Sequence, residues 1–185
     1  MAQWSSGYLE RAVGLPKVWG DIFGVALFAV MLGLGRSLYA KYGKRVETVL
    51  CFGAMGATAC YLVAALSTAP VLGLLACALT GLFVSMLWPG CLVVGAERVP
   101  NGGVFLYAML AAGGDLGASV APQLVGVVTD AAMANEAVLR LATELGLSAE
   151  QCGMKLGMLV GMLFPLAAIA VYWHLARTAK KGRTN

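Results

Sequence analysis

The sequence predicts an all-α, polytopic helical membrane protein, and two observations support this prediction. Hydrophobic residues make up 60% of the 185 residues and charged residues 12%, whereas a soluble domain has about 25% charged residues. The apolar residues form runs long enough to cross a hydrocarbon core as helices. A transmembrane barrel would instead show short strands of alternating hydrophobicity. We therefore expect a single membrane domain, residues 1–185, with the lipid bilayer as its main partner.

Five complete spans are predicted, preceded by a partial N-terminal helix. Their approximate limits are residues 18–35, 46–66, 71–96, 104–128 and 156–173. Prolines are tolerated in membrane helices where neighbouring groups satisfy the carbonyls that the prolines free. Pro89, Pro122 and Pro165 lie in the third, fourth and fifth runs and are expected to mark kinks.

The distribution of positive charge predicts the orientation. Most of the 13 lysines and arginines follow the first, third and fifth runs: Arg36, Lys41, Lys44, Arg45, Arg98, Arg177, Lys180, Lys181 and Arg183. The positive-inside rule places these regions in the cytoplasm. We expect a multi-pass protein of the plasma membrane or the bacterial inner membrane with a cytoplasmic C-terminus. The net charge of +4 is spread over membrane flanks, so we expect no nucleic-acid partner.

The segment 131–152 is long for a link between two membrane helices. Its apolar positions recur at helical spacing among Glu136, Arg140 and Glu144, which indicates a short amphipathic helix on the outer face. Ser148 and Gln151 fit a capping box that opens the last span. This outer helix is either a plain connector or a gating element.

Asp115 is the one charged residue in the run 104–128 and lies near its middle. A carboxylate close to the bilayer midplane costs about 2.5–3.5 kcal/mol on insertion scales, so it usually faces a partner or a watery cavity. Gly113, Gly114 and Gly117 are expected to leave open space around it. The residue is therefore a candidate functional site, and the alternative is a structural hydrogen bond between helices.

Small residues recur at the spacing that lets membrane helices pack closely. Glycines four residues apart form such helix faces, at Gly20/Gly24, at Gly113/Gly117 and at Gly153/Gly157/Gly161. These pairs together predict a tight bundle rather than isolated anchors.

The sequence gives no sign of an enzyme. The five cysteines form no CxxC pair and His174 is the one histidine, so we expect neither a metal site nor a cofactor. No serine, histidine and aspartate set can be assembled. The Gly113–Gly117 stretch lies inside a predicted span, so it is no dinucleotide fingerprint.

The chain resembles the C-terminal half of a major facilitator superfamily transporter, in its fucose-permease-like sugar branch. The first motif is Gly35-Arg36-Ser-Leu-Tyr-Ala-Lys-Tyr-Gly43-Lys44-Arg45, which resembles the cytoplasmic signature loop between the eighth and ninth helices of that family. The usual acidic residue of this loop is missing, because Tyr39 or Ala40 stands near its place. The other motifs are Trp88-Pro89-Gly90, Pro100-Asn-Gly102-Gly103, and Gly114-Asp115-Leu-Gly117 with Pro122, Gly126 and Asp130.

The resemblance implies half of a transporter bundle. Residues 1–9 would match the outer end of the seventh helix, and the five complete spans would be helices eight to twelve. A short echo between Gly20-Asp21-Ile-Phe-Gly24 and Gly114-Asp115-Leu-Gly117 would fit repeated three-helix units. Solute would bind between this half and a missing six-helix N-terminal half or a second chain.

The expected function is therefore transport of a small polar solute, such as a sugar. Candidate substrate-binding residues are Gln3, Trp4, Asp21, Trp88 and Asp115. Tryptophans can stack on a sugar face and carboxylates can accept hydroxyl hydrogen bonds, although Trp4 equally suits a membrane-interface tryptophan. Asp115 could alternatively carry a coupled proton. The competing interpretation is a membrane scaffold or an inactive transporter fragment, in which Asp115 is dispensable.

Overall fold

The computed structural model describes residues 25–182 apart from residues 44 and 68. Within this part of the chain every regular element is a helix. In chain order the helices are α3 (Ala26–Tyr42), α4 (Val46–Leu66), α5 (Pro70–Val84), α6 (Leu87–Arg98), α7 (Gly103–Met133), α8 (Glu136–Glu144), α9 (Ala149–Gly161) and α10 (Leu163–Gly182).

Among the described residues, four stretches are long and apolar enough to cross a membrane. They are Val46–Leu66, Val71–Arg98, Gly103–Met133 and Ala149–Thr178. The prediction of an all-helical chain with membrane-length apolar helices is confirmed, and the predicted spans 46–66, 71–96, 104–128 and 156–173 fall within these four stretches. The remaining predicted span, 18–35, lies partly outside the described residues. Its described part belongs to α3, which is 17 residues long and continues to Tyr42, so the count of five spans stays a prediction.

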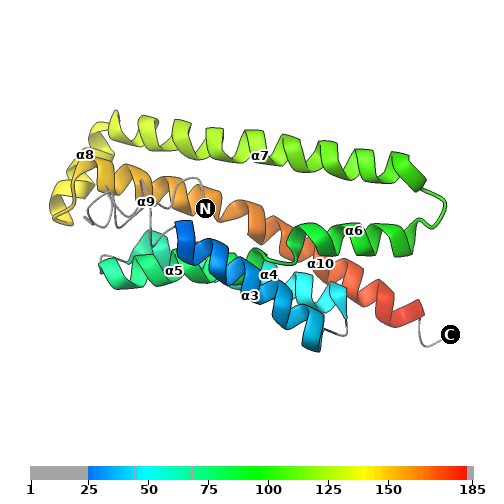
Figure 1. Cartoon of the computed structure of the whole chain (residues 1–185). Coiled ribbons are helices and arrows are strands. Elements are labelled where there is room, and N and C mark those ends of the chain that lie inside the picture. The colour runs from blue at the N-terminus through cyan, green and yellow to red at the C-terminus, as the bar shows by residue number, and fades with distance from the viewer. Residues whose placement is uncertain (1–24, 44, 68, 183–185) are drawn as a thin grey trace.

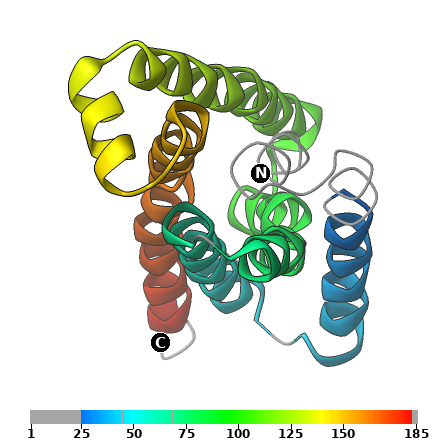
Figure 2. The ribbon, with the colours of Figure 1, turned by 90° about the vertical axis from the view of Figure 1, so that its left-hand side faces the viewer.

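Helix α4 is the centre of the bundle. It packs against α5, α9 and α10, while α3 packs on α5 and α7 on α9. Figure 1 shows the long helices side by side, with α7 at one edge. The end-on view of Figure 2 places α3 and the α9–α10 pair on opposite sides of α4 and α5. Among the described helices, α7 therefore contacts the bundle along one side.

Small side chains allow the helices to approach closely. The core where α4, α5 and α9 meet consists of Ala64, Ala65, Ala76, Cys77, Met154 and Met158. On α9, a Cβ added at Gly157 would lie 2.5 Å from the Thr129 hydroxyl oxygen, and one at Gly153 would lie 2.9 Å from the Thr129 carbonyl oxygen. Two members of the predicted glycine face 153/157/161 thus pack against α7, as small-residue faces do in membrane bundles.

Two helix breaks share one sequence motif, a methionine and a leucine followed two residues later by a proline. The α5–α6 break falls at Ser85 and Met86, the latter in Met86-Leu87-Trp88-Pro89, and the α9–α10 break falls at Met162 in Met162-Leu163-Phe164-Pro165. In both cases the proline is the third residue of the new helix, where a missing N–H is tolerated. The kinks expected at Pro89 and Pro165 are confirmed as helix breaks, whereas Pro122 lies inside the uninterrupted α7.

Helix α3 supplies a hydrogen-bond donor to the helix break before Pro89. Proline has no N–H, so the carbonyl of Ser85, four residues earlier, loses its usual helical donor. The Arg36 Nε of α3 donates a hydrogen bond to this carbonyl oxygen at 3.3 Å. Gly35 is buried, and a Cβ there would lie 2.8 Å from the Leu82 carbonyl oxygen. The absence of that Cβ brings α3 close enough for Arg36 to reach the break.

The predicted outer segment 131–152 is divided among three helices. Helix α7 continues to Met133, α8 occupies Glu136–Glu144, and α9 begins at Ala149. The Asn135 side chain accepts a hydrogen bond from the Ala137 N–H at 2.9 Å and so caps α8. The predicted capping box is confirmed, because Gln151 N–H donates to Ser148 Oγ and Ser148 N–H donates to Gln151 Oε1.

Candidate functional site

The predicted site residues divide into those that the structure describes and those that it does not. Gln3, Trp4 and Asp21 lie outside the described residues, as does Lys44 of the predicted signature loop. The echo at Gly20 and Gly24 and the partial N-terminal helix fall in the same part of the chain. Asp115 on α7 and Trp88 on α6 remain to be placed.

Asp115 lies near the middle of α7 and is exposed in this chain. Its backbone carbonyl accepts a hydrogen bond from Ser119 Oγ at 2.8 Å. Within the described ranges, no hydrogen bond or ion pair reaches its carboxylate. The most apolar stretch of α7 contains no buried residue at all. The expected partner or watery cavity is therefore not built by the described helices.

Trp88 and the Asp115 segment are brought together at the α5–α6 break. A Cβ added at Gly114 would lie 2.6 Å from Trp88 Cζ3 and 3.1 Å from Cη2. The indole ring therefore rests directly on the α7 backbone, one residue before Asp115. Trp88 is still 45% exposed, so a large part of the ring is free to contact another molecule.

The three glycines near Asp115 differ in their surroundings. A Cβ at Gly113 or Gly117 would have nothing within 4 Å, so both positions adjoin open space among the described residues, whereas Gly114 is covered by the Trp88 ring. That this open space serves the Asp115 carboxylate stays a prediction.

The predicted signature loop is mostly helical. Gly35 and Arg36 lie within α3, Gly43 follows its last residue, and Arg45 immediately precedes α4. The expected connection 36–45 is thus too long, because α3 continues through Tyr42. Arg36 donates a hydrogen bond to the Ser85 carbonyl oxygen and so links α3 to the α5–α6 break.

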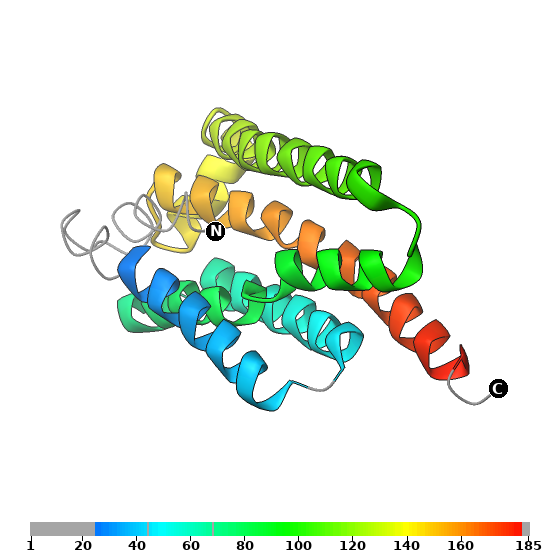
Figure 3. The same cartoon turned by 45° about the vertical axis from the view of Figure 1, so that its right-hand side comes forward.

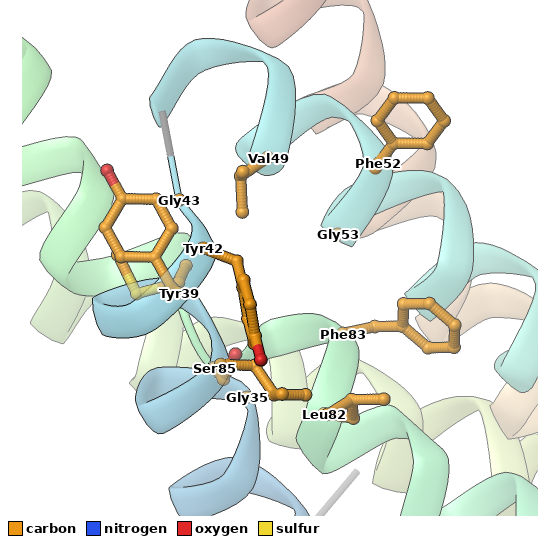
Figure 4. A pocket seen from close by; sticks show the side chains of 12 residues that line it. Gly35, Tyr39, Tyr42, Gly43, Val49, Phe52, Gly53, Leu82, Phe83 and Ser85 are labelled. Atoms are coloured by element: carbon orange, nitrogen blue, oxygen red, sulfur yellow. The ribbon is translucent and has the colours of Figure 1, made fainter. Parts of the chain in front are cut away.

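A cavity of about 320 Å³ lies beside this segment, between α3, α4 and α5. Figure 4 shows the Tyr42 ring extending into the space above Ser85 and Gly35, with Phe52 and Phe83 on the opposite side. Aromatic and aliphatic side chains dominate the lining. The residues around the predicted loop therefore line an apolar cavity. This cavity lies next to the α5–α6 break, where Arg36 donates a hydrogen bond to the Ser85 carbonyl oxygen.

Lys155, which is not among the predicted site residues, is a buried cation. The residue is 8% exposed. Its Nζ donates hydrogen bonds to the carbonyl oxygen of Ala65 at 3.3 Å and to that of Ser67. A cation at a helix C-terminus satisfies carbonyls that lack helical donors and opposes the negative end of the helix dipole. The available signal was its place between apolar and glycine neighbours, Cys152 to Gly157.

The described residues hold no group of three histidine, cysteine, aspartate or glutamate side chains that could bind a metal. The five cysteines are free thiols. Comparison of the chain with family models, with curated proteins and with solved structures gives no match. The resemblance to major facilitator transporters therefore depends on the motifs of the sequence alone.

Proposed function

We propose that this chain is the C-terminal half of a secondary transporter for a small polar solute, such as a sugar, of the major facilitator type. The observation that supports the proposal is the position of Asp115. It is a carboxylate near the centre of the membrane-length helix α7, exposed in this chain, with the Trp88 ring against the preceding residue. A charge at this depth is costly unless it meets a partner or water.

The missing environment of Asp115 would come from a second half. A six-helix N-terminal half, or a second chain, would cover α7 and enclose the solute between the two bodies. Trp88 would then stack on the solute while Asp115 accepts hydroxyl hydrogen bonds, and the two halves would rock around this site. In this proposal the end of the bundle that carries Lys41, Arg45 and Arg98 faces the cytoplasm.

Uptake measurements test this proposal. Membrane vesicles from cells that produce a complete transporter containing this half would be assayed with a panel of labelled sugars, with the amount of protein measured in parallel. We expect Asp115→Asn to keep normal protein levels and to lower uptake at least tenfold, which corresponds to about 1.4 kcal/mol in the limiting step. Asp130→Asn is the matched control, because Asp130 is an exposed carboxylate of the same helix near its outer end.

The two interpretations give different results in this assay. If Asp115→Asn lowers accumulation but leaves exchange of solute across the membrane intact, Asp115 carries the coupled proton. If Asp115→Asn and Asp130→Asn both behave as wild type, or if no sugar is taken up above background, the scaffold or inactive-fragment interpretation replaces the proposal. The exposed apolar surface of α7 would then be a contact surface only.

A further inference from the structure

A second cavity, of about 400 Å³, lies at the far end of the bundle from α8, between α4, α6, α7 and α10. Figure 3 shows α6 and α10 diverging there, with the α6–α7 connection beside them. The walls are chiefly aliphatic: Leu50, Val94, Leu110, Ala168, Val171 and Leu175. Val171 is 57% exposed, so the cavity is open to the surroundings of the bundle. Its volume lies in the range of small-molecule sites.

Two polar bridges between α6 and α10 bound this cavity. Cys91 Sγ and Tyr172 Oη lie 3.2 Å apart at one level. Arg98 donates hydrogen bonds to Thr178 Oγ1 at 3.0 Å and to the Leu175 carbonyl oxygen at 2.8 Å at the other level. Seven residues of α6 separate the two bridges, which is about 10 Å along a helix. Side chains thus hold the two helices together while a gap remains between them.

Arg98 places a guanidinium group with free N–H donors at the mouth of this gap. A guanidinium carries five N–H donors, and two of them are engaged in the bonds to Thr178 and Leu175. Three donors remain for an anion. Arg177 follows on α10, with its guanidinium carbon 4.9 Å from the Trp173 ring centroid. These two cations outnumber Glu97, the carboxylate next to Arg98 in the chain.

We propose that this cavity is a binding site for an anionic phospholipid of the leaflet at the basic end of the bundle. One acyl chain would occupy the aliphatic gap between α6 and α10, and the headgroup phosphate would accept hydrogen bonds from Arg98. Guanidinium groups bind phosphate through charge-assisted hydrogen bonds, and basic pockets between membrane helices bind anionic headgroups. A polar solute does not suit the site, because apart from Arg98 at the mouth the described lining offers polar side chains only at Cys91 and Tyr172.

The test measures lipid selectivity on the purified chain. Phosphatidylglycerol and phosphatidylcholine with identical acyl chains would be added to the protein in detergent, and the bound lipids counted by native mass spectrometry. The wild type should prefer phosphatidylglycerol, and added salt should weaken this preference. Arg98→Gln should lower the preference about fivefold. The control Arg140→Gln, which changes an exposed cation on α8 with an 81% exposed side chain, should leave the preference unchanged.

A cavity-filling variant separates the acyl site from the headgroup site. Ala168→Phe should reduce the binding of both lipids without changing their ratio. If its helix content falls, Val171→Trp, on the exposed side of the same gap, takes its place. Equal effects of Arg98→Gln and Arg140→Gln would show diffuse electrostatic attraction and overturn the proposal. Unchanged lipid binding in the filled variants would overturn it as well. Neither result depends on whether the chain transports a solute.

Discussion

Replacing Lys155 by methionine should destabilise the bundle more than the loss of any exposed cation. Methionine has a similar length and keeps the packing between α9 and α4, but it cannot donate to the carbonyl oxygens of Ala65 and Ser67. These oxygens lie at the C-terminal end of α4, where the helix itself supplies no donors. The substitution therefore removes two charge-assisted hydrogen bonds and leaves their acceptors unpaired.

The magnitude follows from these contacts. A hydrogen bond to a charged group contributes about 1.5–3 kcal/mol net, and a cation at a helix C-terminus adds up to about 1 kcal/mol at an ordinary site. The two bonds share one ammonium group, and α4 ends at Leu66, where water can reach part of the freed carbonyls. We therefore expect Lys155→Met to lower the free energy of unfolding by about 2–3 kcal/mol.

Unfolding in mixed micelles with increasing SDS, followed by far-UV circular dichroism, measures this change. Arg140→Met is the matched control, since Arg140 makes a 3.8 Å ion pair with Glu136 between two highly exposed side chains. Exposed pairs of this kind contribute about 0–1 kcal/mol. A loss below about 0.5 kcal/mol for Lys155→Met, or a loss equal to that of the control, would refute the role assigned to Lys155 as a cap of α4.

Two further predictions concern the contacts between helices. Arg36→Met should lower the free energy of unfolding by about 1 kcal/mol in the wild type. In a Pro89→Ala background the loss should be much smaller, because the alanine supplies an N–H for the Ser85 carbonyl. Additive effects of the two substitutions in a double-mutant cycle would contradict the proposed role of the Arg36 hydrogen bond. Gly157→Leu should strongly destabilise the α7–α9 contact, whereas Gly117→Leu, which meets nothing within 4 Å, should leave the stability of this chain unchanged in the same unfolding assay. A similar cost for both leucine variants would show that the glycine face at Gly157 is not a specific contact.

The sequence alone determined the class of the protein and the features that depend on local chemistry. Long apolar runs predict membrane-length helices whatever their neighbours are, so the four apolar helices of the described residues were predictable. The capping box at Ser148 and Gln151 closes within one turn, so it was readable as well. Pro89 and Pro165 mark helix breaks as their missing N–H predicts, but Pro122 lacks the same N–H and lies inside the uninterrupted α7, so proline alone did not decide where a helix ends.

Only the tertiary structure decided which polar groups find partners. Lys155 looks like a flanking cation until α9 packs beside the end of α4, and Arg36 looks like a loop residue until α3 continues to Tyr42 and reaches the Ser85 carbonyl. Trp88 meets the Asp115 segment only because α6 and α7 lie side by side. The physical reason is that hydrophobic length is a property of one segment, whereas the partner of a buried or mid-membrane polar group depends on which other helix arrives next to it.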